Sequence, residues 1–220
     1  MEKLIKFEIG KSAKEKTLLV SFGECQAELR FQGKLRGRDV LAFDCFTETL
    51  AFEKAEAKKS HALFNGASPY GSVKTEVFFQ NAATLKIKAS ITLKNQAQLD
   101  AFYFTFQGKE GQKKLTPYES KKNWYSGEWP TPYGALSQKG DALVFLVAPE
   151  TFAKRQEWLW QIEAGERSLR FGTDAERSWP LNAFPRSRKL EFTFYLIGTN
   201  VNSLPGALSQ TAWQFAKKET

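Results

Sequence analysis

The stretch Leu85-Lys86-Ile87-Lys88-Ala89-Ser90-Ile91-Thr92-Leu93-Lys94 decides the fold. Its odd-numbered residues are all apolar and its even-numbered residues are all polar. Successive side chains of a β-strand point to opposite faces of a sheet, so this alternation predicts a strand with one buried and one wet face. Such one-sided burial is typical of antiparallel sheets.

The next segment predicts a second strand. After the turn-like residues 95–98, the segment from Leu99 to Gln107 places Phe102, Phe104 and Phe106 on one side. The short polar connection indicates a hairpin. We therefore expect these two segments to form a long antiparallel pair.

Further strands are predicted along the whole chain, mostly separated by Gly, Pro or Asn. Strong alternation marks residues 158–163 and 190–196, and weaker alternation marks 4–9, 17–22, 27–32, 40–46, 73–79, 141–147 and 168–172. So many short strands predict an all-β, two-sheet antiparallel β-sandwich over residues 1–202.

The C-terminal segment 203–220 has a different pattern. Ser203 stands at a capping position before Pro205, and Leu204, Leu208, Ala212 and Phe215 recur at helical spacing. These signals predict a short helix that packs on the sandwich or leads into a further segment.

Length and composition favour one soluble domain. The chain has 220 residues, 42% of them hydrophobic, with 19 Phe and 6 Trp, which is enough for a packed core. No run approaches the roughly 18 apolar residues of a membrane helix, so a membrane partner is not expected. The charged N-terminus does not fit a signal peptide, and a cytoplasmic location is the default expectation.

The formal net charge of +8 permits binding to anionic partners. The lysines and arginines are scattered, however, and the densest groups are pairs such as Lys121-Lys122. A nucleic-acid footprint gathers charge on one face, so this distribution favours an ordinary solvated surface.

Metal and nucleotide chemistry have little support. Cys25, Cys45 and His61 are the only Cys and His residues, and no phosphate-binding glycine motif occurs. No cofactor is expected. The two cysteines fall in neighbouring predicted strands and could form a disulfide, but free thiols are favoured in a reducing compartment. A single histidine without a G-x-S-x-G nucleophile motif is better explained as a loop or strand-end residue than as a catalytic base.

The most unusual stretch is the aromatic segment, residues 115–134. Its candidate ligand-binding residues are Tyr118, Glu119, Trp124, Tyr125, Glu128, Trp129 and Tyr133. Aromatic rings can cover the C–H face of a sugar while amide and carboxylate groups bond its hydroxyls. The alternative, that these rings fill the end of the sandwich core, stays open.

Catalytic carboxylate pairs are poorly supported. Glycoside hydrolysis needs two carboxyl groups facing each other across a cleft. Glu119 with Glu128 and Glu157 with Glu163 are the available pairs, and the second pair is about 20 Å apart along one strand. Exposed surface charge explains both pairs better.

The order of these segments resembles a known family. The strand 85–93, residues 94–95 and the Phe-rich strand to Gln107, followed by residues 148–152, 179–181, 184–185 and 190–196, are similar to galactose-mutarotase-like β-supersandwiches. The resemblance spans most of residues 73–218. It implies a non-catalytic N-terminal module of a glycoside hydrolase, joined to the catalytic part by a helix such as 203–218. Mutarotases use paired histidines, and the single His61 disfavours that activity.

Three functions follow from these observations. The first is a non-catalytic carbohydrate-binding or carbohydrate-enzyme-associated module. The second is a structural or assembly protein whose aromatic segment docks a protein partner. The third is a glycosidase or lyase acting on an acidic polysaccharide, which only the charge suggests.

Overall fold

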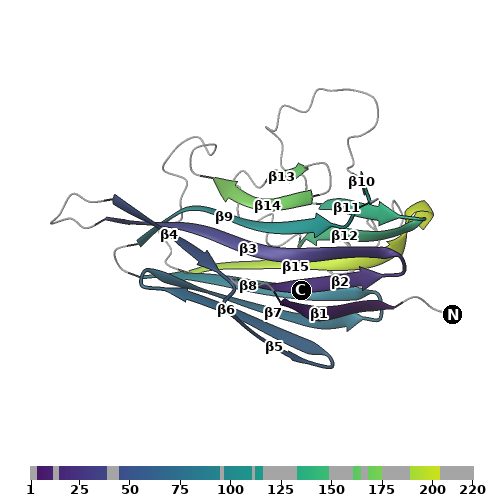
Figure 1. The fold of residues 1–220 in the computed structure, drawn as a ribbon, viewed down its shortest axis with the longest axis horizontal. Helices are drawn as coiled ribbons and strands as arrows, with labels where there is room; N and C mark the ends of the chain where they lie inside the picture. Colours follow the sequence, from purple (N-terminus) through teal and green to yellow (C-terminus); the bar gives the residue numbers. More distant parts are fainter. Residues whose placement is uncertain are drawn as a thin grey trace, which may run out of the picture.

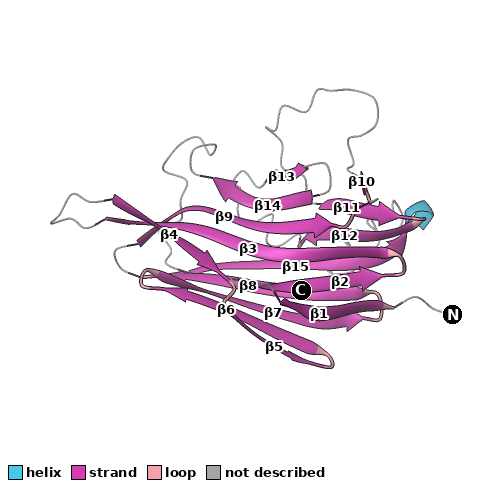
Figure 2. Cartoon of the chain, viewed as in Figure 1, coloured by secondary structure: helices cyan, strands magenta, loops and turns pink. Residues whose placement is uncertain are grey.

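The computed structural model of this chain describes residues 4–11, 15–38, 45–94, 97–110, 112–115, 133–148, 161–164, 168–174 and 189–203. Most of these residues lie in strands, which form two antiparallel sheets stacked face to face (Figures 1 and 2). The predicted all-β two-sheet sandwich is confirmed.

The first sheet has seven strands. In spatial order they are β1 (Ile5–Lys11), β2 (Lys16–Phe22), β3 (Cys25–Arg38), β9 (Ala97–Gly108), β14 (Ser168–Asp174) and β13 (Gln161–Ala164), with β4 (Cys45–Ala51) also beside β3. The 14-residue strand β3 organises this sheet. One edge of β3 pairs first with β2 and then with β4, while its other edge pairs with β9.

The second sheet has eight strands. In spatial order they are β10 (Lys113–Leu115), β11 (Tyr133–Gln138), β12 (Asp141–Val147), β15 (Lys189–Asn200), β8 (Thr84–Leu93), β7 (Gly71–Asn81), β6 (His61–Ser68) and β5 (Lys54–Lys58). Strand β8, which carries the alternating stretch, lies between β15 and β7.

Aromatic side chains join the two sheets. Phe102 and Phe104 of β9 are fully buried and face β15 of the other sheet. Their ring centroids lie 4.9 Å from those of Phe192 and Phe194, respectively. Offset or tilted aromatic pairs at this distance add stabilisation beyond the area they bury. The apolar side of the predicted Phe-rich strand is therefore the centre of the core.

A second buried cluster lies on the other face of the eight-stranded sheet. It consists of Ala135, Val144, Leu146, Ala148, Tyr195 and Ile197. Strand β12 is consequently buried on both faces over its whole length. Burial on both faces explains why residues 143–148 form a continuous apolar run instead of alternating.

The predicted pairing of residues 85–94 with 99–107 is wrong. Both segments are strands, but β8 belongs to the eight-stranded sheet and β9 to the seven-stranded sheet. The chain therefore crosses the core between them instead of forming a hairpin. Alternation predicts which face of each strand is buried. It does not tell whether two strands pair within one sheet or pack against each other from opposite sheets.

Other predictions need correction at the level of single elements. The predicted strand 40–46 is shifted, because β4 begins at Cys45, and strands β5, β6, β10 and β11 were not predicted. The last described residues, Val201–Ser203, form a 3-10 turn. Residues 204–220 of the predicted helix lie outside the described residues, so a helix there stays a prediction.

Candidate functional site

The aromatic segment predicted as the ligand platform falls mainly outside the described residues. The predicted binding residues that lie outside the described residues are Tyr118, Glu119, Trp124, Tyr125, Glu128 and Trp129. Glu157, a candidate catalytic carboxylate, also lies outside them. Tyr133 is the first residue of β11 and pairs with Leu146, while its side chain is not described. Leu115 pairs with Ala135, so the two ends of the segment lie together at the β10 edge of the eight-stranded sheet. The binding role of these residues stays a prediction.

A groove of about 410 Å³ lies on the outer face of the seven-stranded sheet. It crosses β1, β2, β3 and β9. It is lined by Lys6, Phe7, Glu8, Leu19, Val20, Ser21, Gln26, Ala27, Glu28, Gln107, Gly108 and Lys109. Most of these side chains are on the polar face of alternating strands. Alternation predicts that this face points to solvent.

The register of the sheet aligns the groove residues in rows. Leu19 pairs with Glu8 on one side and with Glu28 on the other, and Glu28 pairs in turn with Gln107. In this row, the half-buried Leu19 side chain lies between the carboxylates of Glu8 and Glu28. The Gln107 amide comes next to Glu28. Cross-strand neighbours lie about 5 Å apart, so the row extends roughly 15 Å across the sheet.

The Glu28 carboxylate is the best-defined polar group of the groove. Its Oε2 accepts a hydrogen bond from Arg30 Nη2 at 2.7 Å, and its side chain is only 23% exposed. Partial burial acts to raise the pKa of Glu28, but the nearby Thr17 hydroxyl and the Arg30 guanidinium outweigh it and lower that pKa below its usual value. Glu28 is therefore a fixed, ionised acceptor.

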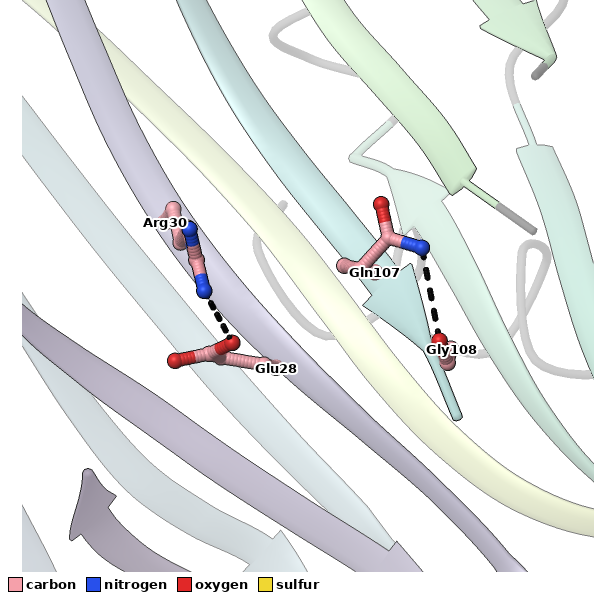
Figure 3. A network of polar contacts seen from close by, with 4 residues as sticks. All are labelled: Glu28, Arg30, Gln107 and Gly108. Atoms are coloured by element: carbon pink, nitrogen blue, oxygen red, sulfur yellow. Dashed lines mark hydrogen bonds and ion pairs between the residues drawn. The ribbon is translucent and has the colours of Figure 1, made fainter. Parts of the chain in front are cut away.

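The amide groups of the groove are also held in place. Gln107 Nε2 donates to the Gly108 carbonyl at 3.3 Å, next to the Glu28–Arg30 pair across β3 and β9 (Figure 3). At the end of the groove, the Lys109 ammonium donates to Gln26 Oε1. Preorganised polar groups lose less conformational entropy when a ligand binds.

This arrangement suits binding better than hydrolysis. Two strand spacings separate the backbones of Glu8 and Glu28, roughly 10 Å, which is close to the carboxyl separation of inverting glycosidases. One of two such carboxyls must carry a proton. The Thr17 hydroxyl and the Arg30 guanidinium lower the pKa of Glu28, so this carboxyl does not fit the role of the acid.

Sequence analysis did not predict this groove. Its residues are individually ordinary polar positions on alternating strands. Only the pairing of β1, β2, β3 and β9 brings Glu8, Glu28 and Gln107 into one row. Pairing partners are set by contacts between distant segments, which periodicity does not encode.

His61 lies away from the groove. It is the first residue of β6, so the strand-end interpretation is confirmed, and it pairs with Phe78 in the eight-stranded sheet. Within the described part of the chain, no group of three or more His, Cys, Asp or Glu side chains is placed to hold a metal ion.

Comparison with known proteins assigns no family. No protein-family model matches the chain, and no curated protein matches it significantly. A functional assignment therefore depends on the chemistry of the site itself. Among the described residues, no helix has the length and apolar character needed to cross a membrane.

Cys25 is a buried free thiol at one end of the sandwich. Its Sγ donates to the Leu136 carbonyl at 3.2 Å. Cys45 pairs with Arg38 at the far end of β3, whereas Cys25 begins that strand. Thirteen residues of extended chain separate the two positions by roughly 40 Å, and a disulfide needs Cα atoms within about 7 Å. The two cysteines of one chain therefore do not pair.

The stability of the protein should fall between pH 9 and pH 11 because of Cys25. Burial, opposed in part by a backbone hydrogen bond, raises the pKa of its thiol from 9.0 to about 11. In that interval the unfolded thiol loses its proton while the folded thiol keeps it, so rising pH favours unfolding by up to about 3 kcal/mol. Urea unfolding at pH 8.5 and pH 10.5 measures the loss. In Cys25→Ala this loss should be smaller, and equal losses in both proteins would refute the assignment.

Proposed function

We propose that this chain is a non-catalytic carbohydrate-binding β-sandwich module that holds a neutral saccharide in the groove on its seven-stranded sheet. The observation that carries the proposal is the row formed by Glu8, Leu19, Glu28 and Gln107. An apolar side chain between fixed carboxylate and amide groups matches a sugar ring, which presents C–H groups on its faces and hydroxyls at its edge.

The charge balance of the groove supports a neutral ligand. The charged lining residues are two lysines and two glutamates, Lys6, Lys109, Glu8 and Glu28. The lining therefore has no net charge. An ionised carboxylate has about four acceptor sites, and the bond from Arg30 uses one of them at Glu28. The remaining capacity can accept hydrogen bonds from sugar hydroxyls.

The sequence adds a second line of support. The resemblance of residues 73–218 to galactose-mutarotase-like supersandwiches, which stays a prediction, favours a module associated with carbohydrate-active enzymes. The sequence also contains aromatic residues, such as Trp124 and Trp129, of the kind that stack on sugar rings.

Calorimetric titration with neutral oligosaccharides, selected from a glycan array, tests the proposal. Glu28→Ala should weaken binding about tenfold, because a hydrogen bond to a charged group contributes roughly 1.5 kcal/mol or more. The matched control is Glu56→Ala, which removes the same charge from the exposed edge strand β5 and should change affinity less than about twofold. The proposal fails if no neutral saccharide binds or if both variants lose affinity equally.

A further inference from the structure

A hollow of about 510 Å³ lies on the opposite side of the sandwich, on the outer face of the eight-stranded sheet. It follows three adjacent strands, β7, β8 and β15. Its charged and hydroxyl side chains are Lys74, Glu76, Lys88, Ser90, Lys189, Glu191 and Thr193. This face is separate from the groove, because the two depressions are on the outer faces of different sheets.

Ion pairs along the two flanking strands satisfy both acidic residues of the hollow. Lys74 Nζ lies 2.6 Å from Glu76 Oε1 on β7. Lys189 Nζ lies 2.6 Å from Glu191 Oε1 on β15. The hydrogen bond from Lys74 lowers the pKa of Glu76 below its usual value, so that carboxylate is ionised at neutral pH. Each glutamate therefore has a lysine partner on its own strand.

Lys88 on the central strand brings the third positive charge of the hollow, and its charge also helps to lower the pKa of the neighbouring Glu76 carboxylate. It pairs with Glu76 on β7 and with Thr193 on β15, which places it between the two ion pairs. Among the described residues Lys88 forms no ion pair, and its ammonium lies 5.8 Å from the centre of the Phe78 ring. Ser90 follows two residues later on the same face. The centre of the hollow thus presents one cation beside hydroxyl groups.

We propose that this hollow binds an acidic sugar, with the Lys88 ammonium on its carboxylate and the Ser90 and Thr193 hydroxyls on neighbouring sugar oxygens. Three lysines and two glutamates leave the hollow with one net positive charge, which fits a ligand with one isolated carboxylate. The ammonium of Lys88 lies over the half-buried Phe78 ring, and this cation–π contact helps to hold the cation in place.

A polyphosphate chain fits this surface less well. Three lysines and two glutamates line the hollow, which leaves one net positive charge. Nucleic acids bind surfaces where many cations neutralise successive phosphates, and the two glutamates would repel such a chain. A uronic-acid residue carries one carboxylate among several hydroxyls. It therefore needs only one positive charge and is repelled less by the two glutamates.

Calorimetric titration with methyl galacturonide, a sugar with one carboxylate, tests the site. Lys88→Gln should weaken binding about tenfold, because it removes the only charge-assisted bond to the carboxylate. The matched control is Lys58→Gln, which makes the same charge change on β5 and should leave the affinity within about twofold. The neutral methyl galactoside should not compete for this hollow.

Three results would overturn the inference: an unchanged affinity in Lys88→Gln, an equal loss in both variants, or tighter binding of a short single-stranded DNA than of methyl galacturonide. Binding of neutral saccharide in the groove is independent of this hollow. Lys88→Gln should leave it intact, so failure of either site is distinguishable from failure of the other.

Discussion

Replacing Phe104 by alanine is expected to lower the free energy of unfolding by about 3 to 5 kcal/mol, the usual range for a buried phenylalanine. Phe104 is fully buried, and its ring centroid lies 5.0 Å from that of Phe31 on the neighbouring strand and 4.9 Å from that of Phe194 in the other sheet. The truncation therefore leaves a cavity between the two sheets, which the surrounding side chains fill only in part. Urea unfolding followed by far-ultraviolet circular dichroism measures the change.

Leu4→Ala is the control for this truncation. Leu4 is a large apolar residue that is 50% exposed, so its removal should cost less than about 0.5 kcal/mol. A Phe104→Ala protein as stable as the Leu4→Ala protein would mean that the two sheets do not pack through this ring.

Replacing Gly66 by alanine should cost about 3 kcal/mol, at the upper end of the range for overpacking. A Cβ atom at Gly66 would lie 1.7 Å from the Ala51 carbonyl oxygen, which belongs to the last residue of β4 in the other sheet. The clash is with backbone, so a rotamer change cannot relieve it. The thermal unfolding midpoint should fall by several degrees.

Gly33→Ala provides the comparison. A Cβ there would first meet the Phe31 ring at 3.3 Å, a tight contact that a small side-chain shift relieves. We expect a loss below about 1 kcal/mol, since the reduced freedom of the unfolded chain offsets part of the crowding. Equal losses at Gly33 and Gly66 would argue against the close crossing of β4 over β6.

Periodicity predicted the strands that have one buried face. Residues 85–94 and 190–196 became β8 and β15, and one alternating set of their side chains, which includes Ile87 and Phe194, is buried in the core. Strand β5 was missed for a physical reason. β5 is an exposed edge strand of alternating charge and alanine, so its sequence carries almost no apolar pattern.

Strand partners could not be predicted in the same way. The apolar residues of β8 and β9 predicted contact between the two strands, and the structure places that contact across the core. The candidate site depends on the same missing information, because Glu28 and Gln107 are 79 positions apart in the sequence and are joined only by the β3–β9 register. The aromatic residues between 118 and 129, which composition singled out, lie outside the described residues.

Two-dimensional amide NMR during titration with the best neutral oligosaccharide tests the central claim most directly. The account predicts that the largest shift changes occur in β2, β3 and β9, at residues such as Ser21, Glu28 and Gln107. Shift changes confined to other parts of the chain, with these three amides unmoved at saturation, would contradict it.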